Sequence, residues 1–122
     1  MPLTWSISHD DRLVMAAVSG EASGQDLEEY MSAVTAAGAM PYRKLFDATY
    51  AAPGSLRLSE LRAFSRKIVA YAKEGRVGPL AIVVGSDLER EMAELFGQAD
   101  AGRALGIFSD VLEARQWLDK LA

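Results

Sequence analysis

Three polar residues stand at the ends of apolar segments and could do chemistry together. Asp47 closes a short segment predicted to be a strand, and Ser86 and Ser109 follow two further apolar runs. In open sheets of alternating strands and helices, ligands bind beyond the carboxyl ends of the strands, where helix N-termini offer unpaired N–H groups. These side chains are therefore predicted to line one rim. The alternative is that Asp47 bonds to the loop after it and both serines cap helices.

The segment 49–58 is the longest predicted irregular stretch, and its Pro-Gly pair marks a turn. Tyr50 either engages a partner from this loop or packs back onto the edge of the core. Ser55 and Ser59 add hydroxyl groups nearby, and Ser59 is also predicted to cap the next helix. The candidate rim for a ligand or partner comprises Asp47, Tyr50, Ser55, Ser59, Ser86 and Ser109.

Signatures of catalysis are scarce in this sequence. The chain has one histidine and no cysteine, so it offers neither a thiolate zinc site nor a multi-histidine site. His9 stands among aspartates in a predicted turn, where a surface role is favoured over catalysis. The sequence has no glycine-rich phosphate loop, no G-x-S-x-G elbow and no H-E-x-x-H pair. We expect a noncatalytic protein without a cofactor or metal; the alternative is a small hydrolase or isomerase with Asp47 as its base.

The bulk composition narrows the class of partner. The formal net charge of -4 disfavours nonspecific binding to nucleic acid, which depends on neutralising phosphates. No apolar run approaches the roughly 18 to 20 residues of a membrane span, and no basic start is followed by an apolar block. A soluble, cytoplasmic protein is the expectation.

The apolar pattern predicts the elements that hold these residues. Alternation at 3–7 and a second apolar run at 13–18, separated by a polar turn, indicate an antiparallel hairpin. Strands then alternate with amphipathic helices, and Ser23 is placed to cap the first helix. The run 80–84 is unbroken, which is typical of a strand buried on both faces. The order β-β-α-β-α-β-α-β-α predicts one domain over 1–122, an α/β layer sandwich with about five strands in a mixed sheet and about four helices.

A family resemblance follows from this order together with particular segments. The chain resembles the STAS fold of anti-sigma-factor antagonists and, more closely, the bacterial SpoIIAA-like family of small stand-alone domains. That family is similar in fold to the CRAL-TRIO lipid-transfer domains. The segments that carry the resemblance are 45–47, 78–84, 106–108 and 114–118. They are mostly apolar strand signatures, which support a fold more than a function.

The resemblance implies two functions and excludes one. STAS regulators switched by phosphorylation carry an Asp-Ser-Ser/Thr-Gly type motif at the start of the helix after the strand that corresponds to 45–48. Here 54–60 reads Gly-Ser-Leu-Arg-Leu-Ser-Glu, so the phosphorylation switch does not carry over. The resemblance implies a regulatory or protein-interaction domain; its lipid-transfer side implies instead a module that binds a small apolar molecule or lipid. An exposed hairpin edge also makes a homodimer possible.

Overall fold

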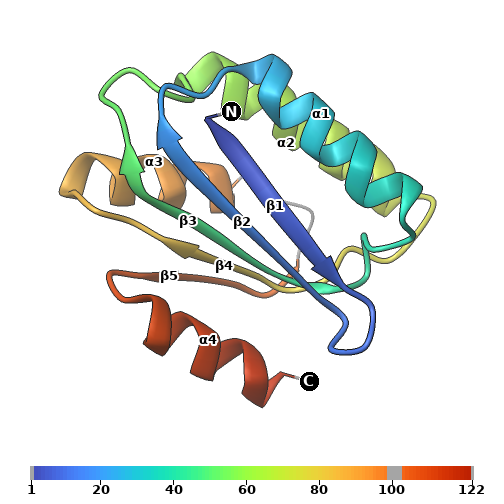
Figure 1. Cartoon of the computed structure of the whole chain (residues 1–122). Helices are drawn as coiled ribbons and strands as arrows, with labels where there is room; N and C mark the ends of the chain where they lie inside the picture. The colour runs from blue at the N-terminus through green and yellow to red at the C-terminus, as the bar shows by residue number, and fades with distance from the viewer. Residues whose placement is uncertain (1, 99–102, 122) are drawn as a thin grey trace.

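The computed structural model describes residues 2–98 and 103–121, which form a mixed sheet with helices on both faces (Figure 1). The elements follow the predicted order. The described strands and helices are β1 Leu3–Ser8, β2 Leu13–Gly20, α1 Gly24–Ala36, β3 Arg43–Ala51, α2 Leu58–Ala72, β4 Leu80–Val83, α3 Asp87–Gln98, β5 Leu105–Phe108 and α4 Val111–Lys120. The predicted α/β layer sandwich is confirmed.

The strands lie in the sheet in chain order, from β1 at one edge to β5 at the other. β1 pairs antiparallel with β2, and the remaining neighbours are parallel. Because crossovers between parallel strands are right-handed and the strands advance in one direction, α1, α2 and α3 fall on one face, called here the inner face. Helix α4 follows the last strand and packs on the opposite, outer face against β3, β4 and β5 (Figure 1).

Strand β4 is buried on both faces, as its unbroken apolar run predicted. All four of its residues are buried. Leu80 and Ile82 pack toward α3 on the inner face, whereas Ala81 and Val83 pack toward α4 on the outer face. Successive side chains of a strand alternate between faces, so only a strand covered by helices on both sides needs four apolar residues in a row.

Strand β3 is longer than its apolar segment predicted. The prediction ended it at residue 48, but it continues to Ala51 because an irregularity in register keeps it paired with β2. Beyond this irregularity Tyr50 pairs with Ser19, and Ala51 pairs with Gly20. Bulges of this kind insert an extra residue without ending the ladder. The loop after β3 is therefore shorter than predicted, and Tyr50 belongs to the strand.

Two predicted helix caps are wrong, and two, at Ser23 and Ser86, are confirmed. Helix α2 begins at Leu58, so Ser59 lies inside the first turn. Helix α4 is capped by Asp110 rather than by Ser109, because the Asp110 carboxylate reaches the N–H of Leu112 at 3.2 Å. Ser23 caps α1 as predicted. A side chain caps a helix only where its oxygen reaches the second or third amide of that helix. Sequence spacing predicts the first residue of a helix only to within one or two positions, so the capping residue can be misassigned.

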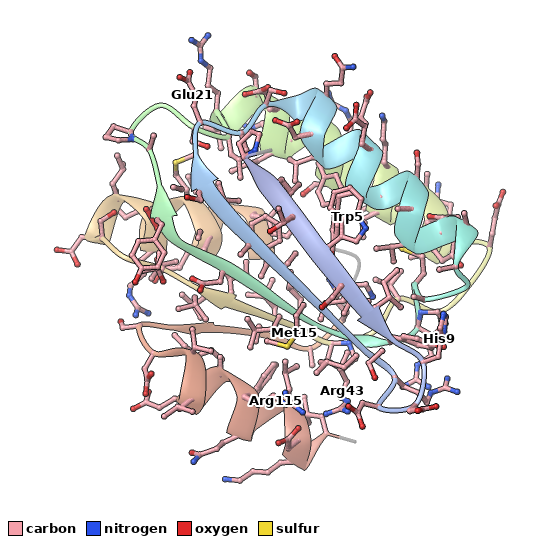
Figure 2. The ribbon with its side chains drawn as sticks, in the orientation of Figure 1. Trp5, His9, Met15, Glu21, Arg43 and Arg115 are labelled. Atoms are coloured by element: carbon pink, nitrogen blue, oxygen red, sulfur yellow. The ribbon has the colours of Figure 1, made fainter. Side chains whose placement is uncertain are left out.

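The outer face is only partly covered. Helix α4 contacts β3, β4 and β5, and Leu13 of β2 is buried beside it. Thr4 and Ser6 on the same face of β1 are exposed, and so is Met15 of β2 (Figure 2). Trp5, on the opposite side of β1, points toward α1 (Figure 2). Among the described residues, no helix is long and apolar enough to cross a membrane.

Candidate ligand cavity

An apolar cavity lies between the inner face of the sheet and helices α1, α2 and α3. Its volume is about 120 Å³. Each surrounding element contributes an apolar wall, including Leu27 and Met31 of α1, Phe46 of β3, Phe64 of α2, Ile82 of β4 and Phe96 of α3. An engineered cavity of roughly 150 Å³ with comparable walls in another protein binds benzene. This cavity therefore has the size for a compact apolar molecule.

Small side chains keep the cavity open. Ala48 and Ala51 line it from β3, and Ala93 lines it from α3, where longer aliphatic side chains would fill the space. On the helix side, α1 contacts α2 and α2 contacts α3, so three neighbouring helices cover the cavity. Protein interiors hold few voids larger than a water molecule. A cavity of about 120 Å³ between the sheet and its helices is therefore unusual for a closely packed protein interior.

Tyr30 is a buried polar residue in the roof of the cavity. Its ring meets the rings of Trp5 and Phe46 edge-on, with centroid distances of 5.6 and 6.1 Å, which holds its orientation. Burial raises the pKa of the Tyr30 hydroxyl above its usual 10.0, and the positive charge of Arg103 opposes part of that rise. The hydroxyl is therefore an uncharged phenol at neutral pH.

Two cationic side chains line the same cavity. Lys44 is 4% exposed, and its Nζ donates to the carbonyl oxygens of Met40 and Tyr42, the second at 2.8 Å. The Arg103 guanidinium carbon lies 6.0 Å from the centroid of the Phe96 ring. A buried ammonium group is costly unless it is hydrogen-bonded, so these backbone carbonyls stabilise Lys44 at the wall.

The loop after β3 contributes one apolar residue to the cavity through local hydrogen bonds. Leu56 is buried and adopts a left-handed conformation with φ of 52°, which is uncommon for a residue with a side chain. Its N–H donates to the carbonyl of Ala22 at 3.1 Å. Beside it, the Ser55 hydroxyl accepts from the Ala22 N–H at 2.8 Å and donates to the Ala22 carbonyl at 3.4 Å. Ser55, a residue of the predicted rim, thus holds Leu56 against the cavity.

The other predicted rim residues do not line this cavity. Asp47 points to the outer face, since Leu45 two positions earlier packs there against α4. Its Oδ1 accepts from the Thr49 N–H at 2.9 Å and from the Thr49 hydroxyl at 2.6 Å. Tyr50 is 75% exposed and pairs with Ser19 across the sheet. Asp47 thus accepts hydrogen bonds from Thr49, two residues later, rather than facing a ligand site. This local role was the alternative prediction for its carboxylate.

Ser86, Ser109 and Ser59 lie at separate positions around the ends of the helices. The Ser86 hydroxyl accepts from the Glu89 N–H at 3.2 Å and caps α3. The Ser109 hydroxyl accepts from Nη2 of Arg90 at 2.8 Å, which joins α3 to the start of α4. Ser59 is exposed in a surface groove between α1 and α2. The six predicted rim residues therefore do not converge on one site.

The polar residues of the cavity were missed because the sequence analysis looked for them at strand ends. Lys44 sits inside β3 and shares the inner face with Phe46, two positions along. A lysine at an inward position of a strand was the available signal. Tyr30 falls on the apolar stripe of α1, so the sequence pattern predicts an ordinary core residue there. Arg103 precedes β5 and has no pattern that assigns it to a cavity.

Comparisons with known proteins identify the architecture. No family model matches the chain, and no curated protein shows significant sequence similarity to it. The chain is similar in structure to an uncharacterized protein of the DUF3478 family from Shewanella loihica PV-4, whose crystal structure is described as having a SpoIIAA-like fold. The match covers 95% of this chain and 91% of that one, with a TM-score of 0.62 and 18% sequence identity. The chain therefore has a SpoIIAA-like fold, as the resemblance of its strand segments implied.

Proposed function

We propose that the protein is a noncatalytic binding module whose inner cavity takes a compact apolar ligand. The observation that carries this proposal is the apolar cavity of about 120 Å³ beneath α1, α2 and α3. Small-molecule sites are typically mostly apolar and contain a few polar groups that orient the ligand. Tyr30, Lys44 and Arg103 are groups of this kind.

The size of the cavity favours a compact ligand over a long lipid chain. Sites for drug-sized molecules occupy about 300 to 1,000 Å³, which exceeds the volume of about 120 Å³ between the sheet and its helices. A single ring or a short branched alkyl group matches this space. The resemblance to lipid-transfer domains therefore supports an apolar ligand, whereas the volume of the cavity favours a ligand much shorter than a lipid chain.

Benzene binding tests the proposal. We expect benzene to raise the melting temperature of the wild-type protein and to shift the NMR signals of residues along the cavity. Ala93→Leu should abolish both effects, because the longer side chain fills the cavity from α3. If Ala93→Leu folds poorly, Ala48→Val provides a second test, because it fills part of the cavity from β3 with a smaller increase in side-chain volume. Ala36→Leu, an exposed site on α1, is the matched control. Absence of any benzene effect on the wild-type protein contradicts the proposal.

A second candidate function is docking of a protein partner on the outer face. Tyr50 is 75% exposed beside the part of that face that α4 leaves uncovered, and Met15 is 36% exposed there. Tyrosine and methionine are enriched in protein interfaces. The regulatory or interaction role implied by the family resemblance would act through this surface.

Affinity capture from native lysate tests this second function. A specific partner should be retained by the wild-type protein and lost with Tyr50→Ala, whereas Tyr71→Ala, on the opposite side of the sheet in α2, controls for loss of a tyrosine. Recovery of the same proteins by wild type and Tyr50→Ala contradicts docking at this face. Sedimentation across a range of concentrations tests a homodimer through the free edge of β1; a monomer throughout rules it out.

A further inference from the structure

Aromatic rings are concentrated around the inner cavity. Four of the elements that enclose it contribute one ring each to the lining: Tyr30 of α1, Phe46 of β3, Phe64 of α2 and Phe96 of α3. The chain has four phenylalanines, and the remaining one, Phe108, packs with α4 on the outer face. A ligand in this cavity is therefore surrounded by rings from the helix side and from the sheet side.

The four rings form two pairs of different geometry. Tyr30 and Phe46 meet edge-on, with an interplanar angle of 72°. Phe64 and Phe96 are closer to parallel, at 21°, with centroids 6.2 Å apart. An aromatic ring has a negative face and a positive edge, so aromatic pairs favour edge-to-face or offset stacked contacts. An aromatic ligand can turn its face or its edge toward these walls, whereas a saturated ring has no such charge distribution to align.

Thioether side chains share the same lining. Met31, Met40 and Met92 line the cavity, and they are three of the five methionines of the chain. A thioether sulfur makes favourable contacts with aromatic rings, and the unbranched methionine side chain adapts to the shape of its neighbour. The lining thus combines rings with side chains that favour contact with rings.

We infer that the cavity selects a flat aromatic ring over a saturated ring or a branched alkyl group of similar size. This inference rests on the proposed function and names the class of its ligand. The selection acts through ring–ring and sulfur–ring contacts, so it requires neither a charge nor a hydrogen-bonding group on the ligand. The volume of about 120 Å³ limits the ligand to one ring with small substituents.

Benzene and cyclohexane separate this selection from simple burial of apolar area. Both are uncharged hydrocarbon rings, and cyclohexane is the more hydrophobic of the two. Burial of apolar area alone therefore predicts that cyclohexane binds at least as tightly. We expect NMR titration and calorimetry to show benzene binding about fivefold or more tightly than cyclohexane. Equal affinities, or tighter binding of cyclohexane, overturn the inference, whereas binding of benzene by itself leaves the proposed function standing.

Variants distinguish the rings from the size of the cavity as the cause of the preference. Phe64→Leu and Phe96→Leu each remove one ring, so each should reduce the preference for benzene by about twofold or more. Leu61→Ala, in the same wall of α2 as Phe64, enlarges the cavity and keeps all four rings, so the preference should persist. A preference that disappears in Leu61→Ala, or that survives both phenylalanine substitutions, overturns the inference. If neither benzene nor cyclohexane binds the wild-type protein, the proposed function and the inference fail together.

Discussion

The Glu60 carboxylate joins the N-terminal turns of two helices through the backbone N–H of Gly24. One of its oxygens accepts from Gly24 at the start of α1, and the other accepts from the Arg57 N–H at 3.1 Å at the start of α2. Carboxylates at helix N-termini satisfy unpaired amides and complement the helix dipole. Here one side chain serves α1 and α2, two of the three helices that cover the cavity.

Removal of this carboxylate should destabilise both helices. Glu60→Ala is expected to lower the free energy of unfolding by about 1 to 2 kcal/mol, because two helix amides lose their acceptor. Glu60→Gln keeps an acceptor and should cost less. Urea denaturation measures both, with exposed Glu91→Ala on α3 as the control. Gly24→Ala should cost less than Glu60→Ala, because its Cβ would lie 3.0 Å from Oε2 of Glu60, which is the end of a flexible side chain and can shift. An unchanged stability of Glu60→Ala would contradict the bridging role.

A side chain at Gly78 should destabilise the protein through a steric clash. A Cβ built there lies 2.2 Å from the Tyr42 carbonyl oxygen and 2.4 Å from that of Pro41, and both are backbone atoms. Gly78→Ala is expected to cost about 1 to 3 kcal/mol of unfolding free energy. Gly75→Ala meets only the Tyr71 side chain, at 3.3 Å, and should cost less. Thermal unfolding compares the two variants. Equal losses of stability would show that the close backbone contacts at Gly78 are not the reason that this position requires glycine.

Asp119 should make stability depend on acid pH. The hydrogen bond from Arg115, followed by that from Arg43, lowers the pKa of Asp119 below its usual 3.8. A carboxyl group with a lowered pKa stabilises the folded state above its unfolded pKa, and this contribution is lost as pH falls through the folded value. The stability difference between wild type and Asp119→Asn should therefore be constant above about pH 5 and shrink in more acidic solution. Urea unfolding across acid pH measures it, and a difference independent of pH contradicts the assignment.

Tyr30 should make stability depend on alkaline pH with the opposite sign. Burial raises the pKa of its hydroxyl above 10.0, so the folded protein keeps a proton that the unfolded chain releases. The stabilisation is complete below pH 10.0 and is lost as pH rises, with a slope of at most about 1.4 kcal/mol per pH unit. Tyr30→Phe removes this slope, and Tyr71→Phe provides the comparison. Phenolate absorbance should show one fewer late-titrating tyrosine in Tyr30→Phe; the same titration in both variants contradicts the burial of this hydroxyl.

The order of elements, the hairpin and the doubly buried β4 were predictable from the sequence. Apolar periodicity is a local property, and it reports which faces of a strand or helix meet other layers. The segment at Leu80–Val83 illustrates this, because its four apolar residues require cover on both faces. Helix starts were less predictable: Asp110 rather than Ser109 caps α4, since the cap depends on how the chain leaves β5.

The site was decided by tertiary structure. Asp47 and Ser55 are close in sequence, yet the alternation of the strand and the hydrogen bonds to Ala22 send one to the outer face and the other to the cavity. Tyr30, Lys44 and Arg103 come from a helix, a strand and a loop, and only the packing of three helices on one face brings them around a common space. Sequence by itself determined the layers of this protein, because burial follows local pattern. The cavity and its lining arose from long-range packing, which no local pattern contains.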